Sequence, residues 1–263
     1  MTKKVFVAFI CIALALCMGT FYGCTSETET QYADEAFIQS MAKGLEARWK
    51  LATKDEGNLT NDTIESTITC IQAELDQLTQ YESARFEDTK LQEKAIKYIN
   101  CLKDSKENVS YRFSDDYDEY EKWQEIYKTR TVLIKDFVEN YGLTVSKEYQ
   151  STLDEFLAKG KSVEKSKNEK TAIQKLVTSL EFKQTKNEYD WKMYEATLEN
   201  TTEYDIKSLQ IDVSLLDKEG TILETRYVFA ENVSKGQKAK LKFDTNTDFE
   251  KLELILDYYE INS

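Results

Sequence analysis

The stretch Leu209-Gln210-Ile211-Asp212-Val213-Ser214-Leu215 alternates apolar and polar residues along its whole length. A period of two is typical of a β-strand with one buried side and one side that faces water. A turn at Asp217–Gly220 follows, and alternation resumes in three later segments. The residues that alternate there are Leu223, Thr225, Tyr227 and Phe229, then Ala239, Leu241 and Phe243, then Leu252, Leu254, Leu256 and Tyr258. Short strands with no helix between them predict an antiparallel β-sandwich over residues 181–263.

The period of the apolar pattern changes near Asn187, which marks the domain boundary. Just after it, Tyr189, Trp191 and Met193 alternate on one parity. Tyr194, Ala196 and Leu198 then alternate on the other parity. This slip of phase predicts a β-bulge within one strand.

Upstream of the boundary, apolar residues recur at one-turn spacing, which is typical of amphipathic helices. The stripes comprise Ala33, Phe37, Met41, Leu45 and Trp49; Ile64, Ile68, Ile71, Leu75 and Leu78; Leu91, Ala95, Tyr98 and Leu102; and Leu153, Phe156, Leu157, Ile173, Leu176, Val177 and Leu180. Such narrow stripes must be buried against one another, so residues 32–180 are expected to form a helical bundle. The expected fold class is α+β, with the helices and the strands segregated along the chain.

Local signals place the ends of these helices. After a break at Gly57-Asn58, Asp62 and Glu65 are spaced like a capping box. A further helix is expected to open at Ser114 and to end at a Gly142 cap. The final helix is expected to begin near Ser146 and to be interrupted near Ser166.

Residues 1–23 have the organisation of a secretory signal: Lys3 and Lys4, an apolar run over residues 5–18, and Gly23 at the exit. Cys24 follows Gly23 and precedes a polar stretch, which resembles a bacterial lipobox. The resemblance implies cleavage before Cys24, diacylation of that cysteine and a lipid anchor at the extracytoplasmic face of the cell membrane. Residues 24–31 would form a tether. An uncleaved membrane span and free secretion are the alternatives.

The strand region is similar to the FxLYD-type domain, an immunoglobulin-like module found at the C-termini of Gram-positive surface lipoproteins. The residues that carry the resemblance are Asn200-Thr201-Thr202, Val213–Gly220 and Val233–Gln237. Val213 and Leu216 stand where the family has its Phe and Tyr. The resemblance implies an immunoglobulin-like β-sandwich and a surface location, with no catalytic residues.

The amino-acid composition excludes several classes of function. The chain has no His, which excludes Ser-His-Asp hydrolysis, Cys-His proteolysis and the commonest zinc sites. Its net charge of −13 disfavours nucleic acid as a partner, because phosphate backbones repel an acidic protein. No cofactor, metal site or catalytic residue is expected.

Two cysteines, Cys70 and Cys101, lie in the mature body. They lie almost equally far from the connection near Arg85, so an antiparallel helical hairpin would bring them level. A disulfide between them is one expectation, and a pair of buried free thiols is the other.

Three surface features allow more than one interpretation. The acidic residues at 115–121 favour a solvated helix start over a calcium site. Lysines 238, 240 and 242 favour a protected edge strand over a site for an anionic wall polymer. Core packing is favoured over a ligand groove for an aromatic stripe made of Tyr117, Tyr120, Trp123, Tyr127, Phe137 and Tyr141.

We therefore expect a non-enzymatic envelope lipoprotein that binds or scaffolds an envelope protein or cell-wall glycan. A solute-binding lipoprotein of a transporter and a carboxylate-dependent hydrolase are the alternatives.

Overall fold

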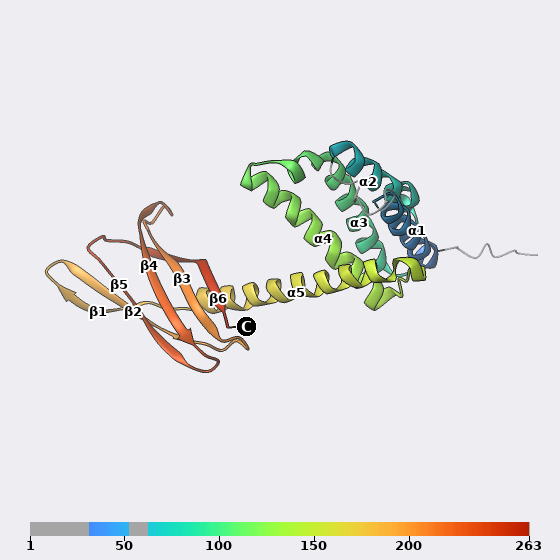
Figure 1. The fold of residues 1–263 in the computed structure, drawn as a ribbon. Helices are drawn as coiled ribbons and strands as arrows, with labels where there is room; N and C mark the ends of the chain where they lie inside the picture. Colours follow the sequence, from blue (N-terminus) through green and yellow to red (C-terminus); the bar gives the residue numbers. More distant parts are fainter. Residues whose placement is uncertain (1–31, 53–62, 263) are drawn as a thin grey trace, which may run out of the picture.

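The computed structural model describes residues 32–52 and 63–262. Helices occupy the first part of this range and antiparallel strands the second (Figure 1). The helices are α1 (Asp34–Ala52), α2 (Ile64–Leu78), α3 (Thr89–Glu107), α4 (Tyr117–Tyr141) and α5 (Gln150–Thr178). The strands are β1 (Lys183–Glu188), β2 (Trp191–Glu199), β3 (Ile206–Leu216), β4 (Ile222–Val233), β5 (Lys238–Thr245) and β6 (Lys251–Ile261). The expected segregation of helices and strands is confirmed.

The first four helices and the start of α5 share one apolar core. Phe37 of α1 is fully buried, and its ring packs edge-on against Tyr81 and Phe137 with ring centroids 5.5 Å apart in both pairs. Edge-to-face contacts of this kind add to the gain from burying the rings. Most of the expected stripes therefore face one another in a bundle, except that Ile64 is 45% exposed and the stripe from Ile173 to Leu180 packs in a second core. None of the described helices combines the length and apolar character needed to cross a bilayer.

The helix ends follow the expected chemistry but not always the expected residue. Thr63 caps α2 and forms a capping box with Ser66, so the predicted box at Asp62 and Glu65 is wrong by one position. Asp62 and the Gly57-Asn58 break lie outside the described residues. Asp116, not Ser114, caps α4, because its carboxylate accepts the backbone N–H groups of Asp118 and Glu119.

At its other end, α4 stops at Gly142 as predicted. This glycine has φ of 71°, a left-handed conformation that costs other residues free energy.

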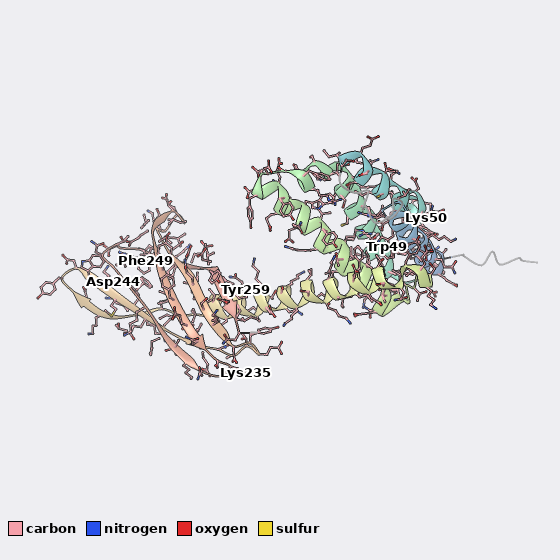
Figure 2. The ribbon with its side chains drawn as sticks, viewed as in Figure 1. Trp49, Lys50, Lys235, Asp244, Phe249 and Tyr259 are labelled. Carbon is pink, nitrogen blue, oxygen red and sulfur yellow. The ribbon has the colours of Figure 1, made fainter. Side chains whose placement is uncertain are left out.

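Helix α5 runs without a break for 29 residues, so the predicted interruption near Ser166 is wrong. Its first half packs on α4, where Gly160 permits a close approach. A Cβ there would lie 2.9 Å from the Cβ of Lys135. Its last turns lie against the strands, and Figure 2 shows Tyr259 of β6 beside this end of the helix.

The strands form two three-stranded antiparallel sheets, ordered β1-β2-β5 and β4-β3-β6. Their facing sides share one apolar core. The predicted phase slip between Met193 and Tyr194 coincides with a register shift in the β1–β2 pairing, but the extra residue lies in β1, between Gln184 and Lys186. Tyr189 and Asp190, which both have positive φ, form the turn between the two strands. Strand β1 was missed because its sequence, Lys-Gln-Thr-Lys-Asn-Glu, carries no apolar alternation.

Helix α5 also contributes to this second core. Ile173, Leu176 and Val177 are buried among strand residues such as Leu198 and Ile211. The last turns of α5, which lie inside the expected helical domain of residues 32–180, thus pack with the strands. Within the described residues, the apolar side chains of the last α5 turns pack against strand residues. The end of the helix and the sheets therefore bury one another.

Candidate functional site

The outer face of the β4-β3-β6 sheet carries large apolar side chains exposed to solvent. Cross-strand pairing places Phe229, Gln210 and Tyr258 in one row across the three strands. Tyr227, Asp212 and Ile255 form the next row. Residues paired directly across strands project to the same side of a sheet. We call these six residues the aromatic face.

The exposure of this face is high. The exposed fractions are 60% for Phe229, 56% for Tyr227, 52% for Tyr258 and 45% for Ile255. Ile222 and Leu223 of β4 are exposed on the same sheet. Six of the thirteen exposed large apolar side chains among the described residues thus belong to β4 and β6. Apolar side chains gathered on one open face mark an interaction surface more often than scattered ones do.

One irregularity turns Tyr258 outward. In β6 the pairing skips Asp257, so Leu256 faces the core while Tyr258 faces solvent and Tyr259 faces inward. The sequence placed Tyr258 with the inward set, and that assignment is wrong. The signal that could have revealed the bulge is the consecutive pair Tyr258-Tyr259, which breaks the alternation.

In β4 the residues at even-numbered positions from 224 to 230 face the core, although the odd-numbered positions there carry the larger apolar side chains. Val228 and Ala230 are buried, whereas the alternating set that includes Tyr227 and Phe229 is exposed. The buried parity also includes Glu224 and Arg226, which hold each other at 2.6 Å. Because this pair neutralises itself, two charged residues occupy the side of the strand that faces the other sheet.

Asp212 lies in the middle of the aromatic face. Its Oδ1 atom is buried and accepts no hydrogen bond from any described residue. Burial raises the pKa of Asp212, and the nearby Asp257 adds to the effect. Asp257 itself accepts a hydrogen bond from Gln210 Nε2 at 2.6 Å. The centre of the face is therefore acidic and incompletely satisfied.

The outer face of the other sheet differs in kind. Ala239, Leu241 and Phe243 point inward and the three lysines of β5 point outward, as predicted. Lys238 pairs with Glu199 at 2.8 Å and Lys242 with Glu195 at 2.7 Å. Strand β5 is an edge strand, so the arrangement matches a protected edge.

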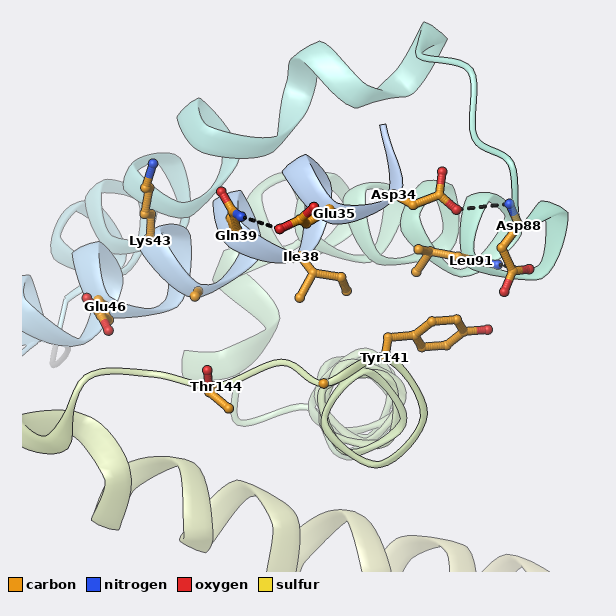
Figure 3. Close-up of a pocket in the computed structure, with 12 residues that line it drawn as sticks. Asp34, Glu35, Ile38, Gln39, Lys43, Glu46, Asp88, Leu91, Tyr141 and Thr144 are labelled. Atoms are coloured by element: carbon orange, nitrogen blue, oxygen red, sulfur yellow. Dashed lines mark hydrogen bonds between the residues drawn. The ribbon is translucent and has the colours of Figure 1, made fainter. Parts of the chain in front are cut away.

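A pocket of about 650 Å³ lies between α1, the end of α4 and the loop that follows it (Figure 3). Its carboxylates serve the fold. Asp34 accepts the backbone N–H groups of Glu87 and Asp88, and Glu46 accepts the N–H of Ser146 at 2.6 Å. Asp88 in turn caps α3. The pocket thus offers few unengaged polar groups to a ligand.

The strongest buried charge lies in the helical bundle. Glu74 of α2 is fully buried and accepts bonds from Arg130 Nη2 at 3.0 and 2.9 Å and from Arg48 at 2.9 Å. The Tyr98 hydroxyl also donates to it. Burial alone would raise the pKa of Glu74, but Arg130 and Arg48 hold it below its usual value. Glu74, Tyr98 and Arg130 are buried and Arg48 is largely so, and together they join four helices, so the cluster is structural.

Both cysteines in the described part of the chain are free, buried thiols, so the expected Cys70–Cys101 disulfide is not formed. Cys101 donates to the carbonyl of Ile126 on α4, 3.3 Å away. Burial raises the pKa of Cys101 to about 11, and burial also raises the pKa of Cys70. Neutral buried thiols are poor nucleophiles.

The remaining predicted residues divide as follows. Cys24, with the leader and the tether, lies outside the described residues. Trp123 and Phe137 of the α4 stripe are buried, while Tyr117 and Tyr120 are exposed. In the described ranges, no three acidic or Cys side chains gather as metal ligands would. No protein-family model matches the chain, and no curated protein matches it.

Proposed function

We propose that this chain is a non-enzymatic lipoprotein, anchored through Cys24 at the extracytoplasmic face of a bacterial membrane, and that it binds an envelope component through the aromatic face. The observation that carries the proposal is the exposure of Tyr227, Phe229, Ile255 and Tyr258 on one sheet face. Aromatic residues are enriched where proteins recognise partners, because they bury much area with little loss of side-chain entropy. The partner class is an envelope protein or a cell-wall glycan.

The proposal includes the finer fold, an immunoglobulin-like sandwich of the FxLYD type. Two three-stranded antiparallel sheets over a shared core support it. In such sandwiches, partners are bound by an exposed sheet face or by the end loops.

The shape of the molecule supports a spacer role for the helices. A tether of residues 24–31 would reach at most roughly 30 Å, which keeps the bundle near the bilayer. Helix α5, with 29 residues, is about 44 Å long and leads from the bundle to the sheets (Figure 1). The aromatic face would then be presented away from the anchor.

Photo-crosslinking on intact cells tests the site. A photoreactive phenylalanine analogue replaces Phe229 in the full chain, and a second variant carries it at Thr197, an exposed residue on the outer face of the other sheet. We expect a discrete crosslinked product from position 229 and none, or far less, from position 197. Equal yields at the two positions would remove the aromatic face from the proposal.

Acylation is tested separately by metabolic labelling with a fatty-acid analogue. The Cys24→Ser protein is expected to lose the label and to leave the membrane fraction. Cys101→Ser is a matched control for loss of a thiol, and it should remain labelled. Continued labelling of Cys24→Ser would contradict lipidation at this residue.

One observation favours each alternative function. A groove of about 1030 Å³, lined by α4, α5 and Tyr259, is where a solute-binding lipoprotein would hold its ligand. Asp212 and Asp257 are the carboxylates that a hydrolase would use, since the pKa of Asp212 is raised. Asp257, however, is hydrogen-bonded to Gln210 on an open face.

A further inference from the structure

The geometry points to a partner of defined charge: we infer that the aromatic face binds a basic segment of another envelope protein, with an arginine or lysine side chain placed against Asp212. This inference rests on the proposed function, because it names the occupant of the same face.

The charge of the face is the first argument. Cross-strand pairing puts Glu231 and Glu253 on the same side as Asp212, since they pair with Ser208 and Ser214. Asp257 joins them through its hydrogen bond to Gln210. None of these four carboxylates forms an ion pair with a described residue. By contrast, Glu260 at the end of the sheet is paired with Lys207 at 2.7 Å. The uncompensated negative charge favours a cationic occupant.

The position of Asp212 is the second argument. Tyr227 and Ile255 flank it on the neighbouring strands, and its Oδ1 atom is buried without a donor. Asp212 as a whole is only half-buried, so a partner can approach a carboxylate that the protein leaves without compensation. A polar group left without a partner costs free energy, and a donor placed against this carboxylate would reduce that cost. A guanidinium group supplies several N–H donors in one plane and keeps its charge at any physiological pH.

The rings around Asp212 are the third argument. A cation within about 6 Å of the centroid of an aromatic ring is attracted to the π-electrons of that ring. This protein already uses such contacts, since the Arg226 guanidinium lies 5.7 Å from the Trp191 ring and that of Arg112 lies 5.2 Å from the Phe113 ring. Tyr227, Phe229 and Tyr258 offer the same kind of surface to a partner.

Two other occupants fit less well. A neutral glycan could stack on the rings but would leave the carboxylates uncompensated. A second copy of this chain carries a net charge of −13, and two of its three outward lysines on β5, Lys238 and Lys242, are already paired with glutamates. Both are distinguishable outcomes of one experiment.

The experiment follows fluorine signals of the full-length protein, labelled with 3-fluorotyrosine and held in neutral detergent. Replacement of Tyr227 or Tyr258 by Phe assigns their signals. The probes are a tetra-arginine peptide, a tetra-glutamate peptide and an N-acetylglucosamine tetramer. We expect tetra-arginine alone to shift both signals, with an affinity that falls as salt is added.

Variants locate the charge. Asp212→Asn is expected to weaken tetra-arginine binding by about tenfold or more. Glu219→Gln removes an equal charge from the exposed β3–β4 turn and should leave the affinity within about twofold, as expected of a carboxylate remote from the site. Phe229→Ala should also weaken binding. Because Phe229 is 60% exposed and belongs to neither core, this variant tests the same face even if Asp212→Asn fails to fold.

Three results would overturn the inference. Shifts caused by the glycan and not by tetra-arginine would assign the face to a carbohydrate. Concentration-dependent self-association that Phe229→Ala abolishes would assign it to a second copy. No shift with any probe would exclude a basic occupant. If crosslinking from position 229 still succeeds in these cases, the proposed function stands and only the basic partner fails.

Discussion

In the helical bundle, the most strongly held charges lie inside and the aromatic rings fill the core. Glu74 is fully buried between two arginines, and Phe37, Tyr98 and Phe137 are fully buried as well. The β4-β3-β6 sheet differs, because the side chains it buries are mainly aliphatic, such as Ile211, Val213 and Val228, while its rings Tyr227, Phe229 and Tyr258 face solvent. Side chains that a fold could bury but leaves exposed are free to serve binding. This contrast supports the proposal that the bundle serves stability and the sheet serves recognition.

The largest expected effect on this comparison comes from Glu74→Gln. The change leaves Arg48 and Arg130 buried without their countercharge, which typically costs about 3–5 kcal/mol of unfolding free energy. Denaturant unfolding followed by helical circular dichroism measures the loss. Binding at the aromatic face should not change. Glu65→Gln, a like change at an exposed site in the first turn of α2, is the control. A loss below about 1 kcal/mol would show that the cluster does not stabilise the bundle.

The same residue predicts a pH dependence. Because the folded pKa of Glu74 lies below its unfolded value, the carboxylate stabilises the fold at pH values above the unfolded pKa. That stabilisation is lost as the pH falls from about 5 through the folded pKa. We therefore measure the unfolding free energy of the helical bundle from pH 7 to pH 3. It should fall more steeply with decreasing pH in the natural protein than in Glu74→Gln. Parallel slopes for the two proteins would contradict this assignment.

A smaller effect is expected where the two regions meet. Ile173 lies on the last turns of α5 and is fully buried in the β core. Truncation of a buried isoleucine to alanine costs about 2–5 kcal/mol. We therefore expect Ile173→Ala to lower the unfolding free energy of the β region, measured by denaturant unfolding followed through the β-strand signal in circular dichroism. A fragment of residues 168–263 should likewise melt at a higher temperature than one of residues 181–263.

The matched control for this test is Lys170→Ala, an exposed position on the same part of α5. If the two fragments melt alike, the helix end is not needed by the sheets, and the boundary drawn at residue 181 is also the boundary of stability.

Features of the fold that are encoded in one short stretch of sequence could be predicted, whereas features that depend on contacts between distant segments could not. The Gly142 cap and most of the helical stripes are set by short-range spacing, and the structure confirms them, although Ile64 is exposed. The alternation of Leu209, Ile211, Val213 and Leu215 likewise marks β3 correctly as a strand with one buried face. In each case one segment, considered alone, contains the pattern.

The aromatic face could not be predicted, because it depends on pairing between strands. Residue Asp257 reverses the parity of β6 only when the strand is aligned with β3. In β4, the half-buried Arg226 is compensated by Glu224, which lies beside it on the same face. The role of Ile173 was missed for the same reason, since a helical stripe does not reveal which partner covers it.

The smallest effect is expected from the cysteines. A Cys70–Cys101 disulfide would add roughly 3–4 kcal/mol on the chain-entropy model, so its reduction would lower the melting temperature measurably. Both thiols are free in the structure, and Cys101 is engaged by the Ile126 carbonyl rather than by Cys70. We therefore expect the melting temperature of the bundle to be the same with and without reductant, and two thiols of the mature body to react once the protein is unfolded. A drop in melting temperature with reductant that the Cys70→Ala protein does not show would restore the disulfide. The bundle would then depend on a covalent link as well as on the Glu74 cluster, whereas the aromatic face would be unaffected.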